Sequence, residues 1–308
     1  THICLNIIEN KSSFQNSLRA KLSDYYILTK PGITLTVLIS MLMGFLMASV
    51  VVKGSIDWVL MIHASIGTYL IAGGTAAHNQ FLERGLDGLM NRTKARPLPT
   101  QRISAFEGKL FSVSLIIVGL SYLVWFTHPV AGAVSLATTL IYLGLYTPMK
   151  QKTAFNIVVG AVPGALPPVG GWAAVTGTVI DPGVWILFAI VFFWQIPHVM
   201  AIAWVCKDDY SGAGFKMLPK GDQNGLKTSI YALLCILILF GVNYSLYALG
   251  LAHALFLISS IPIGLFFLFF GLRFIQSRSH KTARALMFAS IAYLPLIWLV
   301  LSIDVLIY

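Results

Sequence analysis

A row of oxygen-bearing side chains follows the second long apolar stretch of the chain. Asn79, Glu83 and Asp87 recur every four residues, so they share one face if a helix continues through them. Charged residues at membrane depth are costly and usually functional. A second acidic pair, Asp208 and Asp209, follows a later apolar stretch. Carboxylate and amide oxygens are the ligands that magnesium prefers, so we predict that the row holds one ion and the acidic pair a second.

Basic residues lie close to both acidic groups along the chain. They are Arg92, Lys94, Arg96, Lys150 and Lys152. Bare carboxylates would repel a diphosphate, but bridging magnesium ions and these cations can neutralise it together, and arginine suits forked phosphate contacts. We therefore predict that all five bind the diphosphate of a substrate. The alternative is that these are solvated loop charges at a membrane surface, which the regular spacing and the second acidic cluster disfavour.

Tyr146 lies one helical turn before Lys150. A tyrosine at a membrane interface ordinarily belongs to the aromatic belt. Here its phenol and the Lys150 ammonium can flank a diphosphate, and its ring face can stabilise an allylic cation; Tyr142, one turn deeper, can do likewise. We predict catalytic roles for four residues, namely Asp87, Asp209, Tyr146 and Lys150.

The composition indicates an all-α integral membrane protein. The mean hydropathy is +0.81, and only 10% of residues are charged, against roughly a quarter in ordinary soluble domains. A membrane span needs about 20 mostly apolar residues. Nine windows meet this loosely: Gly32–Val52, Trp58–Gln80, Phe106–Phe126, Val130–Tyr146, Asn156–Thr176, Val184–Cys206, Ser229–Gly250, His253–Leu272 and Leu286–Ile307. The fifth contains three prolines, so we expect it to be kinked. We divide the chain into an N-terminal segment, residues 1–31, and a single nine-helix domain, residues 32–308.

The basic residues predict the orientation in the membrane. Of the 21 Lys and Arg residues, 20 fall in the N-terminal segment and in the loops on the same side, and only Lys53 falls on the other. Positive charge marks the cytoplasmic side, or the matrix side in a mitochondrion. The N-terminus and the site loops are therefore predicted to be cytoplasmic. The net charge of +10 is a topology signal, so we predict no nucleic-acid partner.

Two histidines are candidates for a role in binding haem. His78 precedes Asn79, and His198 follows Pro197 about ten residues before the acidic pair. An ionisable group at that depth is a functional candidate, and histidine is a common iron ligand in haem proteins. The alternative is that each ring is hydrogen-bonded to a neighbouring helix.

Three segments carry a resemblance to a known family. Asn79, Glu83 and Asp87, followed by Arg92 and Thr93, resemble the first metal motif of the UbiA superfamily of intramembrane prenyltransferases, with Gln80 in place of the usual acid. Residues 79–99, 146–172 and 208–219 are similar to the haem-farnesylating branch of that family. The resemblance runs from about Asp24 to the last apolar stretch.

The resemblance implies a nine-helix bundle around a central cavity and a magnesium-dependent reaction. A farnesyl group would pass from farnesyl diphosphate to a vinyl group of protoheme IX (haem B), giving haem O. By residue, Asn79, Glu83 and Asp87 would form the first metal motif and Asp208 and Asp209 the second. Arg92, Lys150 and Lys152 would contact diphosphate, and His198 lies in the family's Pro-His segment. The expected location is a bacterial inner membrane, or the mitochondrial inner membrane in a eukaryote.

Two other functions remain open from the sequence. A related prenyltransferase acting on an aromatic or quinone-precursor acceptor would share the fold and the metal clusters. A transporter for an anion or a divalent cation could also gather these charges, although their concentration on one surface argues against alternating access. An association with haem-modifying or terminal-oxidase assembly proteins is also left open.

Overall fold

The long apolar stretches form helices in a computed structural model that describes residues 18–308. Over these residues, nine helical segments are long and apolar enough to cross a membrane, which confirms the predicted number of spans. The elements are α2 (Pro31–Ala48), η1 (Ser49–Lys53), α3 (Trp58–Asp87), α4 (Ala105–Phe126), α5 (Pro129–Leu140), η2 (Ile141–Tyr146), α6 (Thr147–Met149), α7 (Asn156–Ala165), α8 (Pro167–Thr176), α9 (Pro182–Val205), α10 (Lys207–Gly212), α11 (Leu226–Ala248), α12 (Ala254–Ser277) and α13 (His280–Ile307). Residues 18–28 are also helical. Of the predicted N-terminal segment, residues 1–17 lie outside the described part, and its division from the rest at residue 31 stays a prediction.

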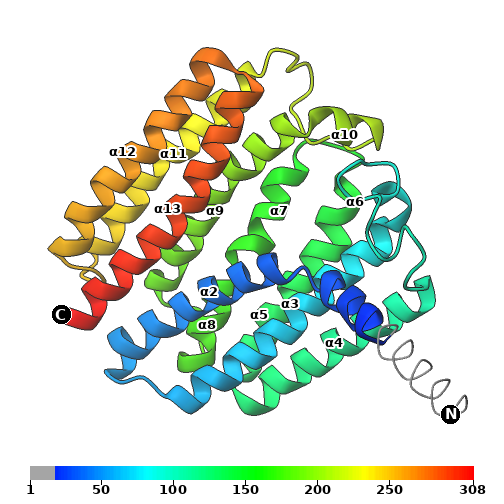
Figure 1. Cartoon of the computed structure of the whole chain (residues 1–308). Coiled ribbons are helices and arrows are strands. Elements are labelled where there is room, and N and C mark those ends of the chain that lie inside the picture. Colours follow the sequence, from blue (N-terminus) through cyan, green and yellow to red (C-terminus); the bar gives the residue numbers. More distant parts are fainter. Residues whose placement is uncertain (1–17) are drawn as a thin grey trace, which may run out of the picture.

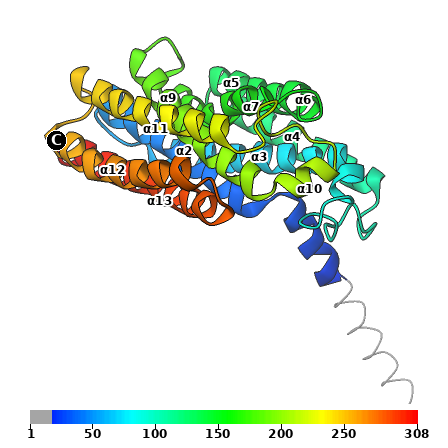
Figure 2. The ribbon, with the colours of Figure 1, turned by 90° about the horizontal axis from the view of Figure 1, so that it is seen from above.

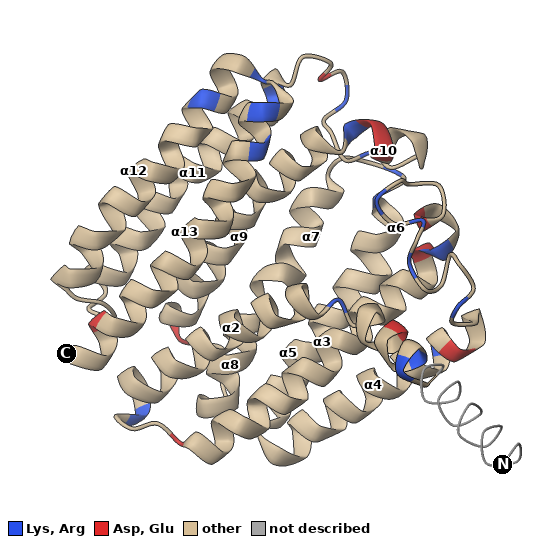
Figure 3. Cartoon of the chain, viewed as in Figure 1, with Lys and Arg blue, Asp and Glu red and all other residues tan. Residues whose placement is uncertain are grey.

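Two groups of helices pack around the interior. Helices α9, α11, α12 and α13 lie side by side on one side of the molecule, while α3 packs on α4 and α2 on α8 on the other (Figure 1). Helix α7 contacts both α9 and η2, so it joins the two groups. Seen from above, α10 and the loop after α3 lie at the end opposite the C-terminus (Figure 2). Most charged residues gather at that same end (Figure 3).

The second span is longer than its apolar window. The prediction ended it at Gln80, but α3 continues to Asp87, with Asp57 as N-cap accepting a hydrogen bond from the Leu60 amide at 2.9 Å. The additional residues are polar, yet Glu83 and Asp87 are buried inside the bundle. Hydropathy does not predict the part of α3 after Gln80, because polar contacts inside the bundle rather than lipid stabilise it there.

Prolines and wide turns shape the centre of the bundle. The predicted kink in the fifth span is confirmed, because α7 ends at Ala165 and α8 begins at Pro167. The fourth span contains the π-helical turn η2, a type of local widening that is common at functional sites. It places the rings of Tyr142 and Tyr146 with their centroids 5.1 Å apart.

Helices α2 and α8 cross in close contact because glycines lie at the crossing. A β-carbon at Gly171 would lie 2.0 Å from the Met41 carbonyl oxygen, and one at Gly44 would lie 1.9 Å from the Pro168 carbonyl oxygen. No side chain fits either position without moving a backbone. The crossing fixes the first half of α2 beside α3 and η2, where the cavity described below is found.

Candidate active site

The predicted row of oxygen ligands lies on one face of α3, and a cation accompanies each member. Asn79, Glu83 and Asp87 are buried, with 1%, 7% and 1% of their surfaces exposed. The three contacts are Lys30 Nζ to Asn79 Oδ1 at 2.9 Å, Lys150 Nζ to Glu83 Oε1 at 2.7 Å, and Arg96 Nη1 to Asp87 Oδ2 at 2.8 Å. Buried charges are stable only when paired, so these cations allow the row to fold inside the bundle.

The loop after α3 connects the row to the second acidic pair. The Thr93 hydroxyl donates to the Asp87 carbonyl oxygen at 2.8 Å, which folds the loop back on the end of α3. Asp209 accepts hydrogen bonds from Asn91 Nδ2 and from the Arg92 amide, both at 3.3 Å. The structure thus brings Asp209 against the segment that follows Asp87.

Asp208 has different surroundings from Asp209. Its side chain is exposed and lines a separate cavity at the same end of the molecule. Of the two acids on α10, Asp209 is therefore the one that contacts the loop following the row on α3.

Lys150 is held between acids and aromatic rings. Its Nζ lies 4.6 Å from the centroid of the Tyr146 ring and 5.9 Å from that of Phe215. Burial alone would lower the pKa of Lys150, but Tyr142 and Glu83 outweigh that effect and raise its pKa above the usual lysine value. These contacts therefore favour the charged form of Lys150.

Lys30 is a site residue that the sequence reasoning did not single out. Burial lowers the pKa of Lys30 to about 7, and the positive charges of Arg96 and Lys150 add to that effect. Its backbone is left-handed, with φ of 47°, and Pro31 begins α2 directly after it. The available signal was its place in the sequence: a lone lysine at the inner boundary of the first span.

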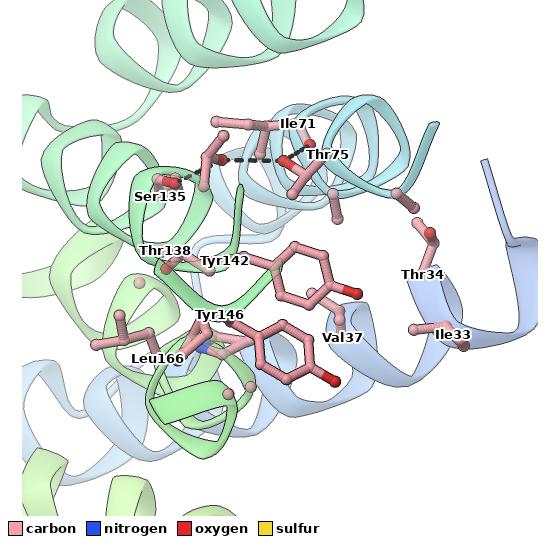
Figure 4. Close-up of a pocket in the computed structure, with 18 of the residues that line it drawn as sticks. Ile33, Thr34, Val37, Ile71, Thr75, Ser135, Thr138, Tyr142, Tyr146 and Leu166 are labelled. Atoms are coloured by element: carbon pink, nitrogen blue, oxygen red, sulfur yellow. Dashed lines mark hydrogen bonds between the residues drawn. The ribbon is translucent and has the colours of Figure 1, made fainter. Parts of the chain in front are cut away.

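An apolar cavity of about 280 Å³ opens beside this row of charges. Lys30, Tyr142 and Tyr146 line it, together with apolar side chains of α2, α3, α5, α7 and α8. Figure 4 shows the two tyrosine rings pointing across the cavity toward Ile33, Thr34 and Val37 of α2. The hydroxyls of Thr75 and Thr139 lie 3.0 Å apart in the wall, so these two polar groups are hydrogen-bonded to each other.

The remaining predicted phosphate contacts are divided between two places. Arg92 Nη2 lies 3.4 Å from the Tyr210 hydroxyl, next to Asp209, and Lys94 Nζ donates to Asn91 Oδ1 at 2.8 Å. Lys152 is exposed and lines the same separate cavity as Asp208. The roles of these three residues stay predictions.

The structure places both candidate histidines against neighbouring helices. His78 Nδ1 lies 2.9 Å from Ser112 Oγ on α4, and His198 Nδ1 lies 2.7 Å from Ser290 Oγ on α13. His198 also stacks on Trp194, with ring centroids 5.4 Å apart. Neither ring lines the apolar cavity, and their role as haem ligands stays a prediction.

The residues of the row fit a magnesium ion better than a metal held by protein alone. Among residues 18–308, no three His, Cys, Asp or Glu side chains converge as a cage. Magnesium does not need one, because it keeps several waters and binds one or two carboxylates together with substrate phosphates. The oxygen-only donors Asn79, Glu83 and Asp87, with Asp209 nearby, match that chemistry.

Comparisons with known proteins agree on one family. The family model for the UbiA prenyltransferase family matches residues 37–293. The chain is 39% identical over 287 residues to the protoheme IX farnesyltransferase of Solibacter usitatus, covering 91% of this chain and 98% of that protein. The fold is similar to the solved structure of a digeranylgeranylglyceryl phosphate synthase, with a TM-score of 0.77, 18% identity, and coverage of 94% of this chain and 100% of the other. It is also similar to a UbiA homologue from Archaeoglobus fulgidus bound to DMAPP and Mg²⁺, with a TM-score of 0.63, 14% identity, and coverage of 91% and 99%.

Proposed function

We propose that this chain, which belongs to the UbiA prenyltransferase family, transfers a farnesyl group from farnesyl diphosphate to a vinyl group of haem B. The observation that carries the proposal is the junction between the apolar cavity and the charged row. Lys30 belongs to both, since it lines the cavity and its Nζ contacts Asn79. A molecule with a long apolar chain and an anionic head fits such a junction.

Magnesium is the cofactor that these oxygen ligands would hold, one ion at the row of Asn79, Glu83 and Asp87 and a second at Asp209. When bound, it neutralises charge on the diphosphate oxygens and so favours their departure. The structure of the Archaeoglobus fulgidus homologue contains Mg²⁺ with a prenyl diphosphate, which supports the same cofactor here.

The paired cations are the groups that would hold the departing diphosphate. Lys150 and Arg96 each contact a carboxylate of the row, so these two cations would neutralise a diphosphate held there. Arg92 stands next to Asp209 and can offer a fork of two donors. Lys94 and Lys152 are more distant and would act through charge.

The cavity would protect the carbon that becomes electron-poor. When the carbon–oxygen bond breaks, the diphosphate keeps the electron pair and the farnesyl group becomes an allylic cation. The faces of Tyr142 and Tyr146 can stabilise that cation, and the apolar walls keep water away from it. The vinyl group of haem then forms the new carbon–carbon bond, and one water adds to the resulting cation and loses a proton, leaving a hydroxyethylfarnesyl group.

The protein is a multi-pass membrane protein, and we propose that its site faces the cytoplasm, or the matrix in a mitochondrion. The concentration of Lys and Arg at the end that holds the row supports this orientation (Figure 3).

One assay tests the proposed function directly. Purified protein is incubated with magnesium, haem B and farnesyl diphosphate, and the pigment is analysed by mass spectrometry while diphosphate release is measured. We expect a product heavier than haem B by one farnesyl group and one hydroxyl. Diphosphate release with an aromatic acceptor but not with haem would favour the related prenyltransferase, and no release with any acceptor would refute prenyl transfer.

Two neighbouring acids provide a matched pair of variants. We expect Asp209→Asn to lower turnover at least 100-fold, because Asp209 faces the loop beyond Asp87. Asp208→Asn should retain most activity, since the exposed side chain of Asp208 faces the other cavity. The reverse result would assign the second metal position to Asp208.

A further inference from the structure

A second cavity lies beside the site and has a different chemical character. Its volume is about 780 Å³, and it is enclosed by the inner end of α9, by α10 and by two loops, residues 152–154 and 215–223. It has no lining residue in common with the apolar cavity. It is large enough to hold a ligand the size of a cofactor.

Positive charge dominates the walls of this second cavity. Four of its lining residues are lysines, namely Lys152, Lys207, Lys216 and Lys220. Over residues 18–308, none of the four forms an ion pair with a carboxylate. The cavity therefore has ammonium groups available for an anionic ligand.

The two acids of the cavity do not balance these lysines. Asp222 is occupied at the start of α11, where it accepts hydrogen bonds from the Thr228 amide at 2.8 Å and the Thr228 hydroxyl at 2.6 Å. Asp208 is exposed and has no such contact among the described residues. The net charge facing the cavity is thus positive.

Aromatic side chains form another part of the wall. Trp204, Tyr210 and Phe215 all line the cavity, and Lys207 Nζ lies 4.6 Å from the centroid of the Trp204 ring. Flat apolar surfaces next to ammonium groups suit a planar, largely apolar ligand that bears carboxylates.

The wall of this cavity also touches the diphosphate cations. The Tyr210 hydroxyl contacts Arg92 Nη2 at 3.4 Å, and the Phe215 ring lies 5.9 Å from Lys150 Nζ. Tyr210 and Phe215 therefore border both the second cavity and the cations that would hold the diphosphate.

We propose that the second cavity is the acceptor site and that its lysines bind the two carboxylates of haem; this rests on the proposed function. Haem is planar and carries its two propionates on one edge and its vinyl groups toward the opposite edge. This orientation places the propionates at Lys216 and Lys220 and requires the vinyl edge to face Tyr210, the lining residue that contacts Arg92. The lysines thus orient the acceptor so that a vinyl group, rather than a carboxylate, meets the allylic carbon.

The experiment compares haem B with its dimethyl ester, which has the same ring and no free carboxylates. The test variant carries Lys216→Gln and Lys220→Gln, and the control is Lys53→Gln at the opposite end of the molecule. An exposed ion pair contributes roughly a threefold effect, so we expect the KM for haem B to rise about tenfold in the double variant. The KM for the ester and the KM for farnesyl diphosphate should stay unchanged, as should every value in the control. Equal increases for haem B and its ester, or no increase for either, would overturn the proposal.

A binding titration separates this inference from the proposed function. Haem B or its ester is added to the protein without farnesyl diphosphate, and binding is followed by absorbance. We expect wild-type protein to bind haem B about tenfold more tightly than the ester, and the double variant to lose that preference. If this pattern appears but no farnesylated pigment forms, the lysine site stands and the proposed function fails. If pigment forms but haem and ester bind alike, only the lysine site fails.

Discussion

The ion pair between Glu83 and Lys150 allows a sharp test of how the site is built. The two charged atoms are 2.7 Å apart, and the side chains are only 9% and 11% exposed. With an effective dielectric constant of about 20, their Coulomb attraction is about 6 kcal/mol before desolvation is counted. Removing one partner of such a buried pair typically costs about 3–5 kcal/mol, because the other charge is left unpaired. We therefore expect Lys150→Met to lower the stability of the bundle by about that amount.

A double variant separates the cost of the unpaired charge from the loss of function. In Glu83→Gln with Lys150→Met, no buried charge is left without a partner, so the combined loss should be smaller than the sum of the two single losses by about 3 kcal/mol. Activity should not recover, because the diphosphate has still lost its cation. A charge-assisted contact is worth about 1.5–3 kcal/mol, so we expect kcat/KM of Lys150→Met to fall by roughly 10- to 150-fold. The double variant should lose at least as much, because Glu83 is also one of the proposed magnesium ligands.

The assay measures thermal unfolding of the wild type, the two single variants and the double variant in one detergent at one scan rate. The kcat and the KM for farnesyl diphosphate are measured for the same four proteins. Lys150→Arg is the matched control, since it keeps the charge. The pKa of Lys150 is raised in the folded protein. The stability that the ion pair contributes is therefore fully present at any pH below the usual pKa of lysine. It is lost only as the pH rises through the raised pKa. The stability difference should therefore be constant from about pH 6 to 9. Additive losses in the double variant, or a wild-type KM in Lys150→Met, would refute the reasoning.

Three further predictions follow from other parts of the site. The pKa of Lys30 is lowered to about 7, so binding a diphosphate above that pH requires Lys30 to take up a proton. We expect the affinity for farnesyl diphosphate to weaken by up to about tenfold per pH unit from pH 7 to 9. In a binding titration, Lys30→Arg should remove this pH dependence. A β-carbon at Gly170 would come no closer to Val134 than 3.8 Å, so a side chain fits there. Gly170→Leu should fill part of the apolar cavity and favour geranyl diphosphate over the longer farnesyl diphosphate. An unchanged ratio of the kcat/KM values for these two substrates would place the prenyl chain elsewhere. The contact of His198 with Ser290 leads us to expect that His198→Ala lowers thermal stability by about 1–2 kcal/mol. If His198 is an iron ligand, as predicted from the sequence, the same variant also changes the haem absorption spectrum, and an unchanged spectrum would refute that role.

The helices were predictable from the sequence because lipid imposes a simple rule on them. Every span had to be a mostly apolar stretch of about 20 residues, and the nine that the structure shows over residues 18–308 were all predicted. Their ends were less predictable. Helix α13 begins at His280, six residues before the predicted window, because Ser279 caps it by accepting a hydrogen bond from the Thr282 amide at 3.2 Å. Capping depends on individual hydrogen bonds that a hydropathy average does not contain.

The row on α3 was predictable for a different reason. The four-residue spacing of Asn79, Glu83 and Asp87 predicts directly that they share one helical face. Their partners were not predictable, because Lys30 and Lys150 lie 49 and 67 residues away from the side chains they contact. Nor could the sequence tell which way His198 points, since α9 is apolar all round and gives no polar face from which to orient it.

The three cation–oxygen pairs have a consequence for how the substrate must bind. Before the diphosphate arrives, Lys150 and Arg96 already contact Glu83 and Asp87, so phosphate oxygens and carboxylates compete for the same donors. The net binding free energy is then the difference between the cation–phosphate contacts that form and the cation–carboxylate contacts that are lost, so it is smaller than either. The same exchange explains why a buried acidic row is stable in a membrane protein without its substrate. It also means that a substitution that strengthens one of these pairs should weaken substrate binding while it stabilises the fold.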